Sequence, residues 1–247
     1  MKIKLNYVII VLSINFLSCG KKTLITPFNK SLIMELEAIY KDDQLVRGVD
    51  VDDLKYNNLS NYRDSLNHTY GFGLHSDSTK LWELQEKKDS LNAKKIKNIL
   101  ELYGYPGLRT VGSPYNTYVW YVMMHQKKDK LNDYLLIVKK ATKKGDLEKQ
   151  FYCQMFDRVM MYNHKEQIYG TQGYGFINFK DQKEEFTQVI WPIKNAKNVN
   201  ELRRKVGFDE TIEVYCKKLL GTDYKKYTIK EIEEIENNNK YNDSNLK

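Results

Sequence analysis

The spacing of apolar residues changes twice along this chain, and these changes limit the folds that are open to it. Up to residue 162, apolar side chains recur every three or four residues, which is the spacing of amphipathic helices. Residues 166–193 are instead rich in β-branched and aromatic side chains and contain several glycines, as strands and turns do. Helical spacing returns after residue 198. The pattern predicts a mainly α fold of the α+β class.

The predicted helices are amphipathic segments separated by glycine, proline or acidic residues. They span 29–43, 80–102, 113–126, 130–143, 146–162, 199–205 and 210–220. The three between 113 and 162 are joined by short turns, which favour antiparallel neighbours. The stretches QIYGTQ, YGFINF and FTQVIWPI predict a small β-hairpin or a three-stranded meander within 166–193. Residues 57–78 are polar and contain glycine, which indicates a loop or an insertion.

The N-terminus has the form of an export signal. Lys2 and Lys4 precede an apolar run that ends at Leu17, and a serine, Cys19 and a glycine follow. This end resembles the lipobox of bacterial lipoproteins, although that family often has a smaller residue in place of Leu17. The resemblance implies cleavage before Cys19 and lipidation of Cys19, so that the protein is anchored to a membrane. An ordinary signal peptide or a single membrane anchor is the alternative.

Length and composition divide the rest of the chain into one globular domain and a C-terminal tail. About 200 residues remain without the signal and the C-terminal tail, which suits one compact core. The end of the tail, ENNNKYNDSNLK, has low complexity, which predicts disorder. No later segment has the roughly 20 apolar residues of a membrane helix. The predicted parts are a signal peptide at 1–18, a tether at 19–27, a single globular domain at 28–220 and a polar, partly disordered tail at 221–247.

The formal charge of +8 comes from 40 basic and 32 acidic residues. The lysines alternate with acids and do not cluster on one predicted face, so nucleic acid is not an expected partner. For a lipoprotein, an anionic membrane surface, glycan or ligand suits this charge better, and solubility is the simpler explanation. The expected location is the periplasmic face of a membrane or the cell surface, with the membrane contacted through the lipid at Cys19 and an unknown small molecule or envelope protein as partner.

Standard catalytic and metal-binding motifs are missing from the sequence. Metal-ligand spacings such as His-Glu-x-x-His or Cys-x-x-Cys do not occur, so we expect neither a metal nor a cofactor. The Gly-x-Ser-x-Gly elbow, Ser-x-x-Lys and a phosphate-binding glycine loop are also missing. Cys153 and Cys216 are expected to be buried free thiols, although an exported protein could pair them. His68, His75 and His164 lie in polar, loop-like stretches and are expected at the surface.

His125 is the best candidate for a general acid or base, because histidine titrates near neutral pH. It ends an otherwise apolar helix, so its ring should face the core or a cleft. Asp157 and Arg158 are adjacent on a helix and cannot share a face. In a functional interpretation, Asp157 orients His125 or Arg158 binds an anion. In a structural interpretation, the Asp157 carboxylate forms a buried ion pair with Arg47 or Arg203, or it caps backbone donors of the hairpin.

A second polar group occurs at the end of the first helix. Asp43 and Arg47 are four residues apart, acid first, which is the favourable order for a helical ion pair. Gln44 lies between them, and a role for it in a cleft depends on the tertiary structure. Arg203 either binds an anionic group or complements the end of a helix as an ordinary cation.

Several fragments, in order, resemble a bacterial family known as domain of unknown function 6624. They are ELEAIYKDDQLVRG, YGYPGLRTVG, the helix that ends at His125, FDRVMMYNHKEQIYGTQ and ELRRKVGF. The resemblance covers roughly Leu32 to Leu219. Members typically have Gln before the histidine and an acid shortly after it, whereas this chain has Met124 before it and Asp129 further on. The family has no established activity, so the resemblance implies the domain without implying a reaction.

The family resemblance also covers the stretch from Gln167 to Gln172. Gly170 suits a turn that other residues resist, and the two glutamines can either contact a ligand or satisfy buried backbone groups. The candidate ligand-binding residues are Asp43, Gln44, Arg47, Gln167, Tyr169, Thr171, Gln172 and Arg203, and the candidate catalytic residues are His125, Asp157 and Arg158.

Three functions fit these observations. The first is a lipid-anchored ligand-binding or interaction module with a polar cleft formed by His125, Asp157, Gln167, Tyr169 and Gln172. The second is a metal-independent hydrolase with His125 as general base. The third is a structural envelope protein in which the same residues complete the core. We favour the first, because the sequence contains no recognisable nucleophile or metal site for the second.

Overall fold

The computed structural model describes residues 28–47, 78–180 and 183–245. It is mostly helical with one two-stranded antiparallel sheet, which confirms the predicted mainly α fold class. The predicted signal peptide, the tether and nearly all of the predicted loop at 57–78 lie outside the described residues. No helix in the described ranges has the length and apolar character needed to cross a membrane.

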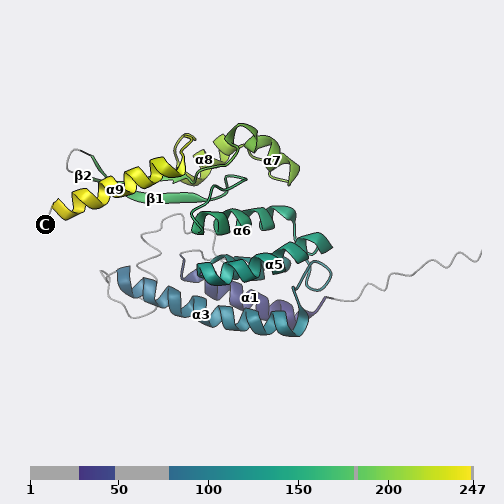
Figure 1. Cartoon of the computed structure of the whole chain (residues 1–247). Coiled ribbons are helices and arrows are strands. Elements are labelled where there is room, and N and C mark those ends of the chain that lie inside the picture. The colour runs from purple at the N-terminus through teal and green to yellow at the C-terminus, as the bar shows by residue number, and fades with distance from the viewer. Residues whose placement is uncertain (1–27, 48–77, 181–182, 246–247) are drawn as a thin grey trace, which may run out of the picture.

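The N-terminal half forms a layered helical body (Figure 1). Its elements are α1 (Lys30–Leu45), α3 (Ser78–Tyr103), the short helix η1 (Tyr115–Thr117), α4 (Tyr118–Met124), α5 (Lys128–Lys144) and α6 (Lys149–Tyr162). The apolar spacing that predicts the first helix brings Leu32, Leu36 and Ile39 into one core with Met123 of α4 and Met155 of α6. This core fixes the ends of α1 and α4 beside each other, and both ends carry predicted site residues.

Helix boundaries follow from their capping residues. The Asn29 side chain accepts the backbone N–H of Leu32, which starts α1. Gly145 has a φ of 73° and ends α5 in the left-handed conformation that glycine adopts without strain. The predicted helix at 113–126 is shorter in the structure, because a single 3₁₀ turn precedes α4 and the helix ends at Met124. His125 therefore lies at the C-terminal cap of α4.

The β-structure is a hairpin of β1 (Gly173–Lys180) and β2 (Lys183–Ile190), with Gly173 opposite Ile190. The alternative of a three-stranded meander is wrong. Residues 167–172 form a loop that is joined to the segment after β2 by an isolated bridge between Gln167 and Ile193 and by a hydrogen bond from the Trp191 N–H to the Gln172 oxygen. The physical reason is that side chains from the helices, rather than a neighbouring strand, bind the backbone of this loop.

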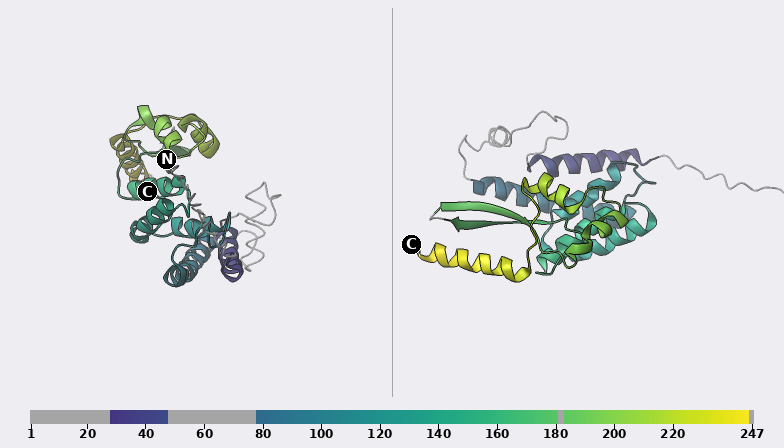
Figure 2. Two further views of the ribbon diagram at one scale, coloured as in Figure 1. Left: turned by 90° about the vertical axis from the view of Figure 1, so that its right-hand side faces the viewer. Right: turned by 90° about the horizontal axis from the view of Figure 1, so that it is seen from above.

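The C-terminal part continues beyond the predicted domain boundary at residue 220. After α7 (Val199–Lys205) and α8 (Ile212–Leu220), helix α9 spans Ile229–Asn245. Figure 2 shows α9 running beside the hairpin, where the fully buried Ile232 packs with Val189 and Trp191. Residues 229–245 of the predicted polar tail therefore include a helix that the sequence analysis did not predict. Their polar composition conceals isoleucines spaced three apart that cover one face of the hairpin.

Candidate functional site

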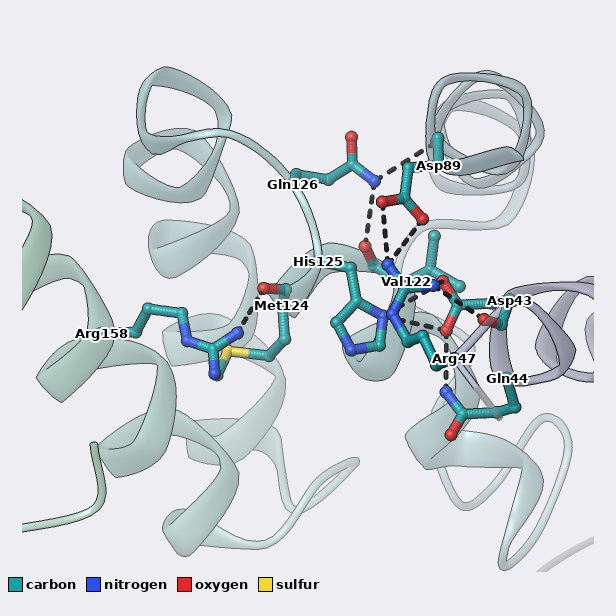
Figure 3. A network of polar contacts seen from close by, with 9 residues as sticks. All are labelled: Asp43, Gln44, Arg47, Asp89, Val122, Met124, His125, Gln126 and Arg158. Carbon is teal, nitrogen blue, oxygen red and sulfur yellow. Dashed lines mark hydrogen bonds and ion pairs between the residues drawn. The ribbon is translucent and has the colours of Figure 1, made fainter. Parts of the chain in front are cut away.

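The predicted site residues fall into two polar networks on either side of the C-terminal end of α4. The first joins the end of α1 to α3 and to His125 (Figure 3). The second lies between α6, the loop at 167–172 and α7. Arg158 of α6 connects the two networks, because it bonds to the backbone on one side of His125 and to the loop on the other.

The first network is centred on Asp43, whose side chain is fully buried. His125 Nδ1 lies 2.9 Å from Asp43 Oδ2 and 3.1 Å from Oδ1. Gln44 Nε2 donates to the same carboxylate at 2.7 Å, and Arg47 Nη1 donates to it at 3.2 Å. Since both Asp43 oxygens act as acceptors, the proton of His125 belongs on Nδ1. The lone pair of a neutral His125 is then on Nε2.

Arg47 is fixed by a second carboxylate that the sequence analysis missed. Its Nη2 donates to both oxygens of Asp89, at 2.7 and 2.8 Å. Burial raises the pKa of the Asp89 carboxyl, and the bonds and charge of Arg47 oppose that rise. Gln126 Nε2 donates to the backbone oxygens of Asp89 and Val122, which ties the residue after His125 to α3. The predicted pair of Asp43 and Arg47 is confirmed, and it is part of a larger network.

His125 lines an open groove of about 1160 Å³ between α3 and α5. Asp89 and Gln126 line the same groove, together with the aromatic side chains of Trp82, Tyr134 and Tyr162. The His125 side chain is 22% exposed, whereas its partner Asp43 is not exposed at all. Within the described part of the chain, His125 Nε2 has no hydrogen-bond partner, and in Figure 3 this edge of the ring points away from Asp43.

The second network is centred on Asp157, and it corrects one prediction. Asp157 does not orient His125, which is paired with Asp43. The buried Asp157 carboxylate instead accepts the backbone N–H groups of Ile168, Tyr169 and Thr171 and the Thr171 hydroxyl, at 2.8–3.2 Å. Burial raises the pKa of Asp157 to about 6, although these hydrogen bonds favour the ionised form. The open alternative of a carboxylate that caps backbone donors is confirmed, and no ion pair with Arg47 or Arg203 forms.

The two glutamines of the loop bind each other and the neighbouring backbone. Gln167 Nε2 donates to the backbone oxygens of Gln172 and Trp191, and the Gln172 N–H donates to Gln167 Oε1 at 2.9 Å. Gln167 is completely buried, so its amide satisfies backbone groups and has no exposed surface for a ligand. The Gln172 amide donates to Gln154 O and to the Thr171 hydroxyl, and its oxygen accepts from Arg158.

Arg203 binds the same loop from the opposite side. It is 1% exposed, and its guanidinium lies 4.8 Å from the ring centres of both Phe208 and Tyr215. It donates to the backbone oxygens of Glu210 and Tyr169, at 2.9 and 3.0 Å. Arg203 lies in the last turn of α7, as the alternative of a helix-end cation predicts, but its side chain is buried between two aromatic rings. Its two hydrogen-bonded nitrogens, Nε and Nη1, both donate to backbone oxygens of the protein.

Gly170 lets the loop pass close to α8. Its φ is 70°, and a Cβ atom at this position would lie 2.6 Å from Ile212 Cδ1 and 2.8 Å from Ile193 Cδ1. The Thr171 carbonyl next to it accepts the hydroxyl of Tyr215 at 2.9 Å. The loop therefore needs glycine both for backbone conformation and for space.

The remaining predicted residues have the following positions. Cys153 and Cys216 are buried free thiols, as predicted. Burial raises the pKa of the Cys153 thiol to about 11, and the half-buried Tyr169 hydroxyl is hydrogen-bonded to it. His164 is exposed beside Glu233, whereas His68 and His75 lie outside the described residues. In the described ranges, no three His, Cys, Asp or Glu side chains are grouped closely enough to hold a metal ion.

No family model matches this sequence, and no curated protein or solved structure is significantly similar to it. The resemblance to the domain of unknown function 6624 family therefore stays a prediction, which rests on the order and spacing of its sequence fragments.

Proposed function

We propose that this protein is a ligand-binding module in which His125 recognises a small polar molecule in the groove between α3 and α5. The observation that carries the proposal is the asymmetry of His125. One ring nitrogen is fixed by the fully buried Asp43, and the other has no partner in the described part of the chain although the ring lines an open groove. An imidazole held in this way presents one hydrogen-bonding atom in a fixed direction.

The groove has the mixture of side chains that suits a polar ligand. Trp82, Tyr134 and Tyr162 provide aromatic surface, and charged side chains of both signs from α3 and α5 surround them. Asp43 fixes the His125 ring by hydrogen bonds, Arg47 in turn donates to Asp43 and Asp89, and Asp89 also lines the groove. The buried residues Asp157, Gln167 and Arg203 belong to the supporting loop network, so they are not ligand contacts in this proposal.

A second candidate function is supported by the same pair of residues. A carboxylate on Nδ1 and a lone pair on Nε2 are the arrangement of a general base, so a metal-independent hydrolase in which His125 activates a water or hydroxyl fits the geometry. We place it second because the described residues near His125 include no serine, cysteine or threonine bonded to its Nε2. Turnover of a chromogenic ester or phosphodiester that disappears with His125 would favour it.

The His125→Asn variant tests the binding proposal. The asparagine amide can still donate to Asp43 from about the position of Nδ1, but it has no counterpart of Nε2. Compounds that raise the melting temperature of the purified protein would be taken from a library of small polar metabolites and then titrated. We expect His125→Asn to keep its melting temperature within a few degrees and to bind at least about ten times more weakly, as the loss of one good hydrogen bond implies.

The matched control is His164→Asn, because His164 is exposed and lies away from the groove. This control should bind like the wild type. Equal affinity in the wild-type and His125→Asn proteins would contradict the role of Nε2. His125 would then not be the residue that recognises the ligand in the groove.

We also propose that the protein is exported and anchored to a membrane through a lipid on Cys19, with a small molecule or an envelope protein as its partner. The support is the sequence of the first 20 residues. In cells that express Cys19→Ala, the protein should move from the membrane fraction to the soluble fraction and should no longer incorporate labelled palmitate. The Cys153→Ala protein should stay in the membrane fraction. Palmitate incorporation that is unchanged in Cys19→Ala would contradict lipidation at this residue.

A further inference from the structure

The polar groups that His125 and its neighbours leave unpaired accept hydrogen bonds rather than donate them. In the tautomer that Asp43 fixes, Nε2 of His125 carries a lone pair. Gln126 Nε2 donates to the backbone oxygens of Asp89 and Val122, so its Oε1 points away from both, as Figure 3 shows. Among the described residues, no group donates a hydrogen bond to Gln126 Oε1. A ligand that pairs with these atoms must therefore bring hydrogen-bond donors.

Asp89 adds a further acceptor to the same groove. Its side chain is 16% exposed, and Arg47 Nη2 donates to both of its oxygens. An ionised carboxylate has about four lone-pair sites, so these bonds leave capacity for more donors. Burial raises the pKa of Asp89 although Arg47 opposes the rise, which means that the protein only partly replaces the lost hydration of this carboxylate. A donor on the ligand would replace more of it.

These acceptors face different ways. In Figure 3 the Gln126 oxygen and the free edge of the His125 ring point in different directions, and Asp89 approaches from α3. A ligand with several separate donors serves such acceptors better than a ligand with one. Hydroxyl groups are suitable donors, because the hydrogen of a hydroxyl rotates toward the acceptor that is nearest. A saccharide carries a hydroxyl group on most of its ring carbons.

The charges that line the groove favour a neutral ligand. Within the described ranges, the lining includes six acidic side chains and five lysines, so the two signs nearly balance. Several of these charges also pair with each other. Lys127 Nζ lies 3.4 Å from Glu86 Oε1, and Lys97 Nζ lies 3.6 Å from Glu101 Oε1. The lining therefore has no large excess of one sign that would select an anion or a cation.

Trp82 gives the groove an exposed aromatic surface. It is 63% exposed, whereas Trp120 and Trp191 are 4% and 2% exposed and donate their indole N–H groups to backbone oxygens. Trp82 precedes Asp89 by seven residues, so the two lie on one face of α3, two turns apart. The negative face of an aromatic ring attracts the carbon-bound hydrogens that cover one face of many sugar rings. An aromatic ring and hydrogen-bond acceptors thus line one groove.

We propose that the groove binds a neutral saccharide, whose ring stacks on Trp82 and whose hydroxyl groups donate to the acceptors at and beside His125. This inference rests on the proposed function of the groove and adds the chemical class of the ligand. The groove volume of about 1160 Å³ lies above the usual range of about 300–1,000 Å³ for small-molecule sites, so two or more linked sugar units suit it. A peptide suits it less well, because its backbone brings one acceptor for each donor.

The experiment is a titration of the purified full-length protein with cellobiose, maltose and N,N′-diacetylchitobiose, each followed by ¹H–¹⁵N NMR. We expect at least one disaccharide to produce saturable shifts of the Trp82 indole N–H and the Gln126 side-chain amide. The indole N–H groups of Trp120 and Trp191 are internal controls that should not shift, because both are buried and bonded to backbone. N-acetyl-trialanine amide, a neutral peptide, should bind at least about ten times more weakly than that disaccharide.

Trp82→Ala should fold like the wild type, because its side chain is largely exposed, and should bind the disaccharide at least about five times more weakly. Leu136→Ala is the matched control. Leu136 is 62% exposed on α5 but does not line the groove, so this variant should bind like the wild type. The inference is overturned if no disaccharide shifts the Trp82 resonance saturably, if the peptide binds as tightly as the disaccharides, or if Trp82→Ala keeps full affinity.

The two proposals fail in different ways. If the metabolite titration depends on His125 but no disaccharide binds, the ligand-binding function stands and its saccharide class is wrong. If a disaccharide binds in a manner that depends on Trp82 but equally well to His125→Asn, the groove is a saccharide site and the recognition role of His125 is wrong.

Discussion

The Asp157→Ala protein should lose about 4 kcal/mol or more of unfolding free energy, which is the largest effect we expect from a single substitution in this chain. The Asp157 carboxylate accepts three backbone N–H groups and one hydroxyl from residues 168–171. Each buried donor left without an acceptor costs about 1–3 kcal/mol. No neighbouring strand can replace the lost partner, because the loop is not part of the hairpin. Urea unfolding followed by circular dichroism measures the loss.

Asp209→Ala is the control for this measurement, since Asp209 is exposed between α7 and α8. Its effect should stay within about 0.5 kcal/mol, as for most surface substitutions. A total unfolding free energy of about 5–15 kcal/mol is usual for a domain, so Asp157→Ala could leave little folded protein at 37 °C. An Asp157→Ala protein as stable as the control would show that the loop does not depend on this carboxylate.

The same residue predicts a pH dependence of stability. The pKa of Asp157 is raised to about 6 in the folded protein, whereas an unfolded chain has a value of about 3.9. Between these two values the folded state binds more protons than the unfolded state, so the contribution of Asp157 is fully present below about pH 4 and falls as the pH rises to about 6. The stability advantage of the wild type over Asp157→Asn should therefore be larger at pH 4 than at pH 7. A stability advantage of the wild type over Asp157→Asn that grows between pH 4 and pH 7 would contradict the predicted direction of this pH dependence.

The regular parts of the fold could be predicted because their signals are local. The predicted segment 199–205 agrees with α7, and the predicted helix at 80–102 differs from α3 by a few terminal residues. The spacing of Leu32, Leu36 and Ile39 gave both the helix and its buried face. The predicted strand QIYGTQ was wrong for a physical reason. Its side chains suit a strand, but a carboxylate ten residues earlier on α6 binds its backbone donors, and no local pattern reveals that.

The candidate site could be predicted only in part for the same reason. Asp43 and Arg47 were found as a helical pair because they are four residues apart. Asp89 was missed because it meets Arg47 across 42 residues of sequence, and nothing in its own neighbourhood distinguishes it from the other acids of α3. Choosing Asp43 rather than Asp157 as the partner of His125 required the contact between α1 and α4. The buried fraction of each side chain separates the polar residues that support the loop from those that face the groove, and the sequence alone does not give this fraction.

The second large effect is expected for Asp43→Asn. The new amide has nearly the shape of the carboxylate, so packing is preserved while the hydrogen bonds change. Gln44, Arg47 and His125 all donate to Asp43, and in either orientation an amide nitrogen would face at least one of these donors. We expect a loss of about 2–4 kcal/mol of unfolding free energy, because the substitution leaves buried donors and the charge of Arg47 less well compensated.

The functional consequence of Asp43→Asn is distinct from this loss of stability. Without a carboxylate acceptor on Nδ1, the His125 proton is free to move to Nε2, where it removes the lone pair that the proposed ligand or substrate needs. Two-bond ¹H–¹⁵N NMR of the imidazole reports the tautomer, and a titration reports the affinity. Asp42→Asn is the matched control: Asp42 is the neighbouring acid, its ion pair with Lys88 is partly exposed, and such pairs contribute about 0–1 kcal/mol. An Asp43→Asn protein that keeps the Nδ1–H tautomer and full affinity would show that Asp43 supports the fold alone and does not set the chemistry of His125.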